Sequence, residues 1–408
     1  MRRILFVDDE PMVLDGLRRM LRSMRKEWDM EYATSGGEAL EILAVRVFDV
    51  LVTDMRMPGM DGCQLLNQVR ELYPHIVRII LSGQSDREDI FESLGPVHQY
   101  LSKPCDAEML KSTVARTFAV RNLLENDSIA DVISKIESLP SLPSLYTEIM
   151  DEIGSPNGSL ARVGEIISKD IGMSAKILQL VNSSFFGLAT HVTSPTKAIA
   201  LLGLETVKSL VLGIKIFSRF SRSDLSYCSI AGLWDHSVAT GYLAKEIARH
   251  LKLSQAEIGD SFLAGLVHDI GKLILLDRLP EACSKIVEEA SSTGCAMFEA
   301  EKKVLGTTHA RIGAYLLGIW GFSESIIDGV AFHHCPSECS NEGLSALTAV
   351  YLADGRQHKN DRDKVNKAGS FDQDYLSKLG IDHSEEFQLA CSNHCRLGEE
   401  RGCENSFR

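Results

Sequence analysis

The chain is organised around residues 263–273, which read Leu263-Ala264-Gly265-Leu266-Val267-His268-Asp269-Ile270-Gly271-Lys272-Leu273. The aliphatic residues recur at three- and four-residue steps, which predicts a helix with one apolar stripe facing a core. Gly265, His268, Asp269 and Lys272 follow the same spacing on the opposite side of that helix. An imidazole beside a carboxylate is a suitable pair of ligands for a divalent metal. A solvated helix face is the competing interpretation, and it is the more common one for an isolated His-Asp pair.

Composition limits the class of protein. The 408 residues are 44% apolar and 24% charged, which indicates a globular protein of about two to three domains. The net charge of −13 argues against nucleic acid or an anionic membrane as the main partner. No run of about 18 uncharged apolar residues occurs, so we expect no membrane insertion. Acidic residues follow Val7 too early for a secretory signal, so the ten cysteines are expected to be reduced thiols in the cytoplasm.

Residues 1–122 alternate apolar runs with helical patterns, which predicts a doubly wound, parallel α/β domain. We expect buried strands at residues 3–7, 48–53, 77–81 and 97–101. A helix is marked between the first two by Val13, Leu17, Met20, Leu21 and Met24. Each strand is followed by polar residues, in order Asp8-Asp9, Asp54, Ser82 and Lys103. Because ligands bind at the carboxyl ends of parallel strands, these residues should converge in one crevice.

Three carboxylates in one crevice repel each other, and a divalent cation relieves that repulsion. Mg²⁺ suits a site made of oxygen ligands that keeps positions open for water and a phosphoryl group. Lys103 would pair with the added negative charge, and the hydroxyl of Ser82 would hydrogen-bond to it. An α/β domain with incidental acids at its strand ends is the competing interpretation.

The ordered set resembles the receiver domain of two-component response regulators, and so does the loop Thr53-Asp-Met-Arg-Met-Pro-Gly-Met-Asp-Gly62. The matching residues are Asp8 and Asp9 for the Mg²⁺ ion, Asp54 as phosphoacceptor, Ser82 as switch hydroxyl, Tyr100 as the aromatic residue that changes rotamer on activation, and Lys103. The resemblance implies a sensor histidine kinase as a partner.

Residues 123–135 continue the helical pattern that starts after Asp106, so we expect a helical linker there. The pattern is too irregular over successive heptads to predict a coiled coil. The linker either carries the signal, with a homodimer as one possible form, or acts as a passive tether. Pro140 and Pro143 then end the helix and open a new domain.

Residues 136–356 are almost continuously helical in period, which predicts a compact all-α domain. The domain is similar to the HDOD family, a signalling output domain related to the HD phosphohydrolases. The similar segments are Leu139–Pro143, Ile167–Asp170, Lys176–Ser183, Ala198–Gly203, Trp234–Ser237, Gly265–Gly271, His309–Ala314 and His333–His334. HDOD domains are regarded mainly as regulatory modules, so the resemblance implies binding of a downstream signalling protein.

The HD phosphohydrolases hold a metal with one histidine, the His-Asp pair and a later aspartate. By position, the resemblance carries these ligands onto His236, His268, Asp269 and Asp354. The related HD-GYP phosphodiesterases add further ligands and a lysine, which match His309, His333, His334 and Lys272. Divalent Fe, Mn or Zn there would bind a phosphodiester and lower the pKa of a bridging water. Two observations oppose this: no Gly-Tyr-Pro loop follows His334, and core histidines are often purely structural.

Residues 357–408 predict a polar linker and a C-terminal helical tail, docked through Phe371, Tyr375, Leu376, Leu379 and Ile381. Cys335 and Cys339, beside two histidines, could bind zinc, and the tail residues Cys391, His394, Cys395 and Cys403 could form a soft-metal or redox site. Free thiols are the better interpretation of both sets. Asn182-Ser183-Ser184 is either a partner contact or a buried hydrogen-bonded cap.

Two functions remain open at this point. The first is a signalling switch whose output domain binds another protein, and the second is a phosphorylation-gated metal phosphohydrolase. A DNA-binding transcription factor is disfavoured, because the sequence has no helix-turn-helix candidate and is acidic.

Overall fold

A computed structural model describes residues 2–82, 97–121, 123–124, 127–136, 140–141, 148–149, 151–153, 155, 158–182, 191–203, 218–219, 230–341, 343–360 and 371–381. The chain divides into two compact units. The first unit comprises Met1–Ser221 and Tyr315–Phe322, and the second comprises Arg222–Ala314 and Ser323–Arg408.

The first unit begins with a five-stranded parallel sheet in the order β2-β1-β3-β4-β5. The strands are β1 (Arg2–Val7), β2 (Trp28–Ala33), β3 (Val50–Asp54), β4 (Val77–Ser82) and β5 (Gln99–Ser102). The four predicted strands are present, each within two residues of the expected bounds. The edge strand β2 was not predicted, because Asp29 and Glu31 interrupt its apolar pattern and only its end residues are buried.

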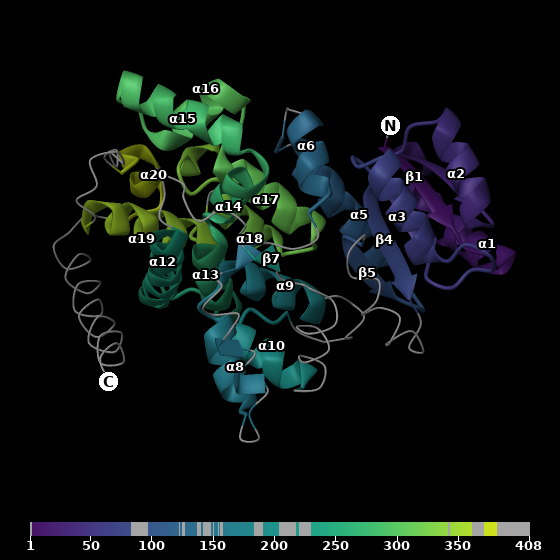
Figure 1. The fold of residues 1–408 in the computed structure, drawn as a ribbon, viewed down its shortest axis with the longest axis horizontal. Coiled ribbons are helices and arrows are strands. Elements are labelled where there is room, and N and C mark those ends of the chain that lie inside the picture. Colours follow the sequence, from purple (N-terminus) through teal and green to yellow (C-terminus); the bar gives the residue numbers. More distant parts are fainter. Residues whose placement is uncertain are drawn as a thin grey trace. The chain divides into compact units, whose positions relative to one another are not determined.

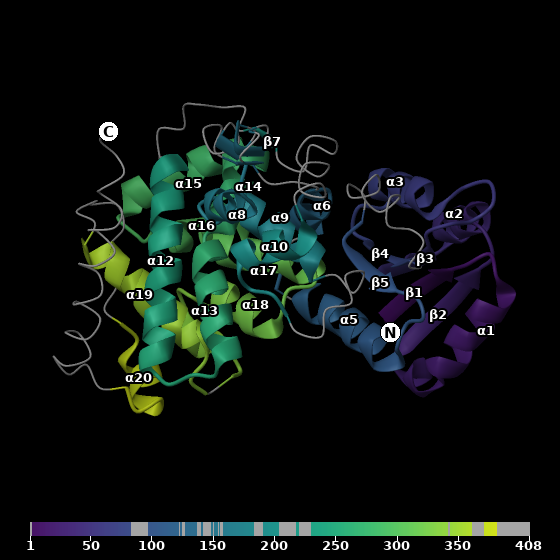
Figure 2. The same ribbon diagram turned by 90° about the horizontal axis from the view of Figure 1, so that it is seen from below.

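Helices cover both faces of the sheet (Figure 2). One face carries α1 (Pro11–Met20) and α5 (Ala107–Arg121), and the other carries α2 (Gly36–Val45) and α3 (Gly62–Leu72). The helix expected to reach Met24 ends at Met20 and is followed by a 3₁₀ turn, Arg22–Lys26. The predicted doubly wound α/β fold is confirmed. This fold gathers the carboxyl ends of β1, β3, β4 and β5 at one edge.

The rest of the first unit is mainly helical. Its helices are α6 (Asp127–Ser134), α8 (Leu160–Ile167), α9 (Ile171–Val181) and α10 (Pro195–Leu202), and β6 (Pro140–Ser141) pairs with β7 (Ser218–Arg219). The helical pattern expected to continue from α5 through the linker is interrupted, since α5 ends at Arg121 and α6 begins at Asp127. Ile133 and Ile136 of this linker are buried, so it packs as part of the unit.

The second unit is built from helices, as predicted (Figure 1). They are α12 (Ile230–His250), α13 (Gln255–Val267), α14 (Ile270–Arg278), α15 (Pro280–Thr293), α16 (Met297–Leu305), the start of α17 (His309–Ile319), α18 (Glu324–Ala331), α19 (Ala346–Asn360) and α20 (Gln373–Lys378). A 3₁₀ turn, Pro336–Glu338, follows α18. Helix α17 belongs to both units, because its last residues, from Tyr315, are counted with the first.

The segment 263–273 is not one helix. Helix α13 ends at Val267 and α14 begins at Ile270, so His268 and Asp269 form the junction between them. The predicted apolar stripe is buried, but so are His268 and Asp269, at 0% and 1% exposure. The competing interpretation of a solvated helix face is therefore wrong.

The C-terminal tail docks as expected where the structure describes it. Helix α20 buries Tyr375 and Leu376, and the hydroxyl of Tyr375 lies 2.9 Å from that of Thr348 on α19. Helix α19 itself continues to Asn360, past the expected start of the linker at residue 357. The cysteines of the tail lie outside the described residues. Among the described helices, none is both long enough and apolar enough to span a membrane.

Candidate functional site

The acidic residues predicted at the strand ends come together in the structure. Asp8 and Asp9 follow β1 and Asp54 ends β3, and one carboxylate oxygen from each lies within 4.8 Å of the others. The Nζ atom of Lys103 lies 2.7 Å from Asp8 Oδ2 and 2.6 Å from Asp54 Oδ1. Asp8 is fully buried, whereas the side chain of Asp54 is 13% exposed. Asp54 is therefore partly accessible to solvent, and the charged side chains of Asp8, Asp9 and Lys103 lie around it.

The charges in this crevice are coupled. Burial raises the pKa of the Asp54 carboxyl above its ordinary value, although the neighbouring Lys103 acts in the opposite direction. Burial by itself lowers the pKa of the Lys103 ammonium, but hydrogen bonds to Asp54 and Asp8 raise it overall. Three oxygen ligands and one ammonium fit a small, hard cation with an anionic group added on Asp54. The donor set therefore fits Mg²⁺.

Ser82 and Tyr100 lie on the two strands beside β3. Ser82 ends β4 and is 1% exposed, and its hydroxyl has no hydrogen-bond partner among the described residues. Tyr100 lies in β5 opposite Ile80 and is 4% exposed. The structure thus places the expected switch hydroxyl at the same edge of the sheet as Asp54, with a buried tyrosine on the next strand.

A second cluster lies inside the other unit, where the HD-type residues come together. His236 of α12 places Nε2 3.2 Å from His268 Nε2 and 3.0 Å from Asp354 Oδ1 of α19. His268 Nε2 lies 3.5 Å from the same Asp354 oxygen. We call His236, His268 and Asp354 the first ligand group. Three elements far apart in sequence supply it.

The other histidines form a second ligand group, His309, His333 and His334. One ring nitrogen from each lies within 4.8 Å of the others. His309 begins α17, and its Nε2 lies 3.1 Å from Nε2 of His334, which follows α18. His333 is buried, and its Nε2 has no hydrogen-bond partner among the described residues. A buried polar atom without a partner is costly, and it is a signal for a ligand.

Asp269 stands between the two groups. Its Oδ2 lies 3.4 Å from His268 Nε2 and 3.9 Å from His236 Nε2, on the side of the first group. Its Oδ1 lies 3.2 Å from His309 Nε2 and 3.9 Å from His333 Nε2, on the side of the second. One carboxylate that offers one oxygen to each group is suited to bridge two cations. Lys272 pairs with Oδ2 at 2.7 Å.

The outward ring nitrogens fix the orientation of three of the histidines. Nδ1 of His268 lies 2.7 Å from the carbonyl oxygen of Gly265, and Nδ1 of His333 lies 2.7 Å from that of Val330. Nδ1 of His309 contacts the carboxylate of Glu301. When Nδ1 donates its proton in a hydrogen bond of this kind, the lone pair of Nε2 can bind a cation, as in metal sites.

Burial and neighbouring charges shift the pKa values of the residues in the cluster. Burial alone would raise the pKa of Asp269, but His268, Lys272 and His309 hold it well below its ordinary value. Burial by itself lowers the pKa of His309, but the Glu301 carboxylate raises it to about 9. Burial, with the charge of His268, lowers the pKa of His333 to about 3. An ionised Asp269 and a neutral His333 are the forms that bind a metal.

Two close backbone contacts bring the ligands together. A Cβ atom on Gly265 of α13 would lie 2.8 Å from the Cα of Gly241 on α12, the helix that carries His236. A Cβ atom on Gly271 of α14 would lie 1.9 Å from the carbonyl oxygen of His309. Only glycine permits these approaches, so the glycines on either side of the His268-Asp269 junction set how near the other histidines come.

The remaining predicted ligands do not join either group. Cys335 and Cys339 are free cysteines and belong to no ligand group among the described residues. Asn182 bonds through both polar side-chain atoms to the backbone of Val192, each at 2.7 Å, which fits the interpretation as a cap.

Glu301 contacts His309 but was not predicted, because it lies in a charged helical stretch that has the pattern of a solvated face. No signal in the sequence distinguishes it from Glu299.

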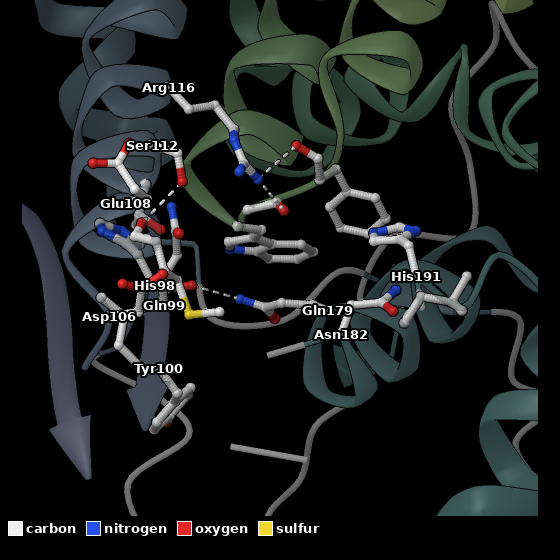
Figure 3. Close-up of a pocket in the computed structure, with 17 residues that line it drawn as sticks. His98, Gln99, Tyr100, Asp106, Glu108, Ser112, Arg116, Gln179, Asn182 and His191 are labelled. Atoms are coloured by element: carbon white, nitrogen blue, oxygen red, sulfur yellow. Dashed lines mark hydrogen bonds between the residues drawn. The ribbon is translucent and has the colours of Figure 1, made fainter. Parts of the chain in front are cut away.

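In the first unit, the β5–α5 side of the sheet contacts helices that follow it in sequence. Gln99 Nε2 donates to the carbonyl oxygen of Ile319 at 2.9 Å, and Gln179 Nε2 of α9 donates to that of His98 at 3.0 Å. Arg116 Nη1 donates to the carbonyls of Gly321 and Phe322 at 2.8 and 3.3 Å. Figure 3 shows these side chains around a cavity of about 700 Å³, which Tyr100 also lines.

Two family models match the chain. The response regulator receiver domain matches residues 4–115, and the HDOD domain matches residues 139–336. The HDOD match includes His236, His268, Asp269, His309, His333 and His334 but ends before Asp354.

Known proteins are similar to parts of the chain. An uncharacterized protein of Treponema pallidum is 27% identical over 245 residues, 59% of this chain and 47% of that protein. The hydrogenase transcriptional regulatory protein HoxA of Cupriavidus necator is 37% identical over 214 residues, 49% of this chain and 44% of HoxA. The chain thus spans less than half of these relatives. The crystal structure of an HDOD domain protein with unknown function from Geobacter sulfurreducens covers 72% of this chain and 98% of its own, with 19% identity and a TM-score of 0.40.

Proposed function

Because the chain is a response regulator with a receiver domain followed by an HDOD output domain, we propose that it is a phosphorylation-dependent switch that acts by protein binding. A receiver domain implies a phosphodonor, and we propose that a sensor histidine kinase phosphorylates this protein in the cytoplasm. The output would be the binding of a downstream signalling protein to the HDOD domain, and a second copy of this chain is an alternative partner. The observation that carries the proposal is the network from Gln99 and Arg116 to residues 319–322.

Asp54 would accept the phosphoryl group, with Mg²⁺ held by Asp8, Asp9 and Asp54. The ion would neutralise charge on the transferred group, and Lys103 would pair with the phosphoryl oxygens after transfer. A phosphoryl group adds about −1.5 to −2 charges. The Ser82 hydroxyl would turn toward it, and Tyr100 would follow inward into the space that Ser82 leaves.

Tyr100 lies next to Gln99 on β5 and lines the cavity that Arg116 also lines (Figure 3). A change in the tyrosine would therefore alter the surface that supports residues 319–322. Phosphorylation would shift the balance between a docked and an undocked receiver, for which a difference of a few kcal/mol is sufficient. The released HDOD surface would then bind the partner.

The experiment compares full-length protein with and without a phosphoryl mimic at Asp54, such as beryllofluoride. Proteins retained from the native cytosol by each form are identified, and the affinity of each retained partner is measured with purified components. We expect affinity to differ at least about tenfold between the two forms, and Asp54→Asn to abolish the difference. Equal affinities for every partner would reject the switch.

The histidine cluster favours a second candidate, a metal-dependent phosphohydrolase of the HD type. The first and second ligand groups would each hold one divalent cation, Fe, Mn or Zn, with Asp269 between them. Metals there would bind phosphate oxygens and lower the pKa of a bound water. Lys272 would keep Asp269 ionised and oriented through its contact with Oδ2.

The second candidate is tested with bis(p-nitrophenyl) phosphate and cyclic dinucleotides on protein loaded with Mn²⁺. Metal-dependent hydrolysis that Asp269→Ala abolishes, while Cys339→Ser leaves it intact, would establish the enzyme. Bound metal without turnover of any phosphodiester would leave the switch as the function and assign the cluster a structural or regulatory role.

A further inference from the structure

Helix α16 lies beside the second ligand group, although none of the proposed ligands belongs to it. It packs against α15 through the buried residues Ile286, Ala290, Met297 and Ala300. Phe298 and Glu301 are three residues apart on α16 and therefore share a face of the helix. Both side chains contact histidines of the second group.

Glu301 is fully buried and makes three contacts to one residue. Its Oε2 lies 2.7 Å from the backbone nitrogen of His309 and 2.7 Å from Nδ1 of its ring, and Oε1 lies 2.9 Å from Nδ1. The carboxylate accepts the Nδ1 proton, so in the neutral ring, the form that binds a metal, the lone pair of His309 is at Nε2. That atom lies 3.2 Å from Asp269 Oδ1 and 3.1 Å from His334 Nε2.

His309 differs in this respect from the other two histidines whose Nδ1 partner is known. His268 and His333 use backbone carbonyls three residues earlier on their own chain segments. Such a carbonyl orients the ring but carries no net charge. A carboxylate orients the ring and also makes Nε2 a stronger donor toward a cation.

Phe298 acts on the neighbouring ring. Its side chain stacks on the imidazole of His334, with ring centroids 4.7 Å apart and an interplanar angle of 14°. Stacking fixes the plane of the ring while leaving both nitrogens available for bonding. One face of α16 thus orients two of the three histidines in the second group.

We propose that Glu301, assisted by Phe298, is a positioning residue that fixes His309 and His334 as metal ligands of the second group. The inference rests on the metal site of the second candidate function and names the residues that would set its affinity. Glu301 itself would not be a ligand, because its carboxylate oxygens contact Nδ1 and the backbone nitrogen of His309.

The test uses the purified full chain titrated with Co²⁺ against a chelator, with the visible absorption of bound Co²⁺ as a second readout. Wild type is expected to bind two Co²⁺ ions. Glu301→Gln should weaken the second ion by about 10–100-fold, the usual effect of losing an outer carboxylate partner, and change its absorption. Phe298→Leu should have a smaller effect of the same kind. Glu299→Gln is the matched control, because Glu299 is exposed on the same helix and should leave both ions unchanged.

A double variant separates positioning from folding. Glu301→Gln should cost no further affinity in protein that already carries His309→Ala, since the glutamate acts through that ring. A purely structural role predicts a lower melting temperature with unchanged Co²⁺ affinity in the folded protein, and that result overturns the proposal. Glu301→Asp keeps the charge but shortens the reach, so it should fall between wild type and Glu301→Gln. Wild type without any bound Co²⁺ would reject the metal site itself, whereas two ions in both wild type and Glu301→Gln with equal affinities would reject only the role of Glu301.

Discussion

Gln99, on the last strand of the receiver sheet, donates a hydrogen bond from Nε2 to the carbonyl oxygen of Ile319, the last residue of α17, at 2.9 Å. Arg116 of α5 adds hydrogen bonds to the carbonyls of Gly321 and Phe322. The last carbonyls of a helix have no partner within the helix and need one from elsewhere. Side chains of β5 and α5 therefore donate hydrogen bonds to backbone carbonyls of residues 319–322, which lie in the HDOD match.

Removing the Arg116 guanidinium should make the backbone of residues 315–322 exchange with solvent more often. We expect Arg116→Ala to raise the hydrogen-exchange rate of backbone amides in residues 315–322 by about 10–100-fold, because a hydrogen bond from a charged donor contributes about 1.5–3 kcal/mol. Exchange in the sheet strands β1 and β3 should not change. The measurement is hydrogen exchange of the full chain, followed by mass spectrometry.

Lys111→Ala is the control on the same helix. Lys111 pairs with Glu108 at 2.9 Å, an i,i+3 contact on the surface of α5, so its loss should leave residues 315–322 as in wild type. Equal exchange in Arg116→Ala and Lys111→Ala would mean that the hydrogen bonds of Arg116 do not hold this segment.

The buried side chain of His98 should make the stability of the fold depend on pH. Its Nδ1 lies 3.1 Å from the backbone nitrogen of Arg78 and its Nε2 lies 3.0 Å from the carbonyl oxygen of Ser134 in the linker helix α6. Burial and the charge of Arg78 hold its pKa well below the ordinary value of 6.5. Protonation would also remove the acceptor at Nδ1, so the folded chain needs the neutral ring.

The direction in which stability changes with pH follows from the protons that the folded and unfolded chains bind. Below about pH 6.5 the unfolded chain binds a proton at His98 that the folded chain does not, so stability is complete above that pH and falls as pH decreases, by up to about 1.4 kcal/mol per unit. We expect the unfolding midpoint in urea to fall less steeply between pH 6.5 and 5 in His98→Gln than in wild type. His250→Gln, at the exposed end of α12, is the control. Parallel curves for wild type and His98→Gln would contradict the prediction.

Phosphotransfer should depend on Asp54 and on a divalent ion. Incubation with acetyl phosphate and Mg²⁺ should phosphorylate Asp54 alone. Borohydride reduction then converts the acyl phosphate to homoserine with release of phosphate, and mass spectrometry maps the homoserine. Asp54→Ala, or chelation of the metal, should reduce the adduct to background, since the crevice then lacks its acceptor or a charge to offset Asp8 and Asp9. Asp61 is the N-cap of α3, in the loop after β3, and the control Asp61→Ala should still be phosphorylated at Asp54. An adduct that persists in Asp54→Ala would reject the assignment.

The acidic crevice was predictable because parallel strands bring their carboxyl ends to one edge. Four apolar runs in order, each followed by a polar residue, were enough to group Asp8, Asp9, Asp54 and Lys103. The helix break at His268-Asp269 was not predictable, since the apolar residues on both sides are buried and keep one period across it. No period or spacing relates His236 to His268 or Asp354, so only the resemblance to HD enzymes grouped them. Glu301 was hidden because tertiary packing, and not sequence, buries it.

The last prediction concerns the first ligand group. His268 lies within 3.5 Å of both His236 Nε2 and Asp354 Oδ1 and is fully buried. If the group binds a cation, His268→Ala should remove that ion, with a loss of affinity beyond the roughly 100-fold that an outer partner costs. The ion at the second group should remain, since His309, His333 and His334 are intact. Metal content measured by elemental analysis after Mn²⁺ loading should fall from two ions to one.

Stability separates this result from unfolding. The metal-free form of His268→Ala should retain its helical circular dichroism and melt within a few degrees of metal-free wild type, because the change also removes a ring whose Nε2 faces other polar atoms. Added Mn²⁺ should raise the melting temperature less in the variant than in wild type, since one binding site fewer is linked to folding. His250→Ala, on the same helix as His236 but at its exposed end, should behave as wild type. Full metal content in His268→Ala would show that the first group does not hold a cation, however close its side chains lie.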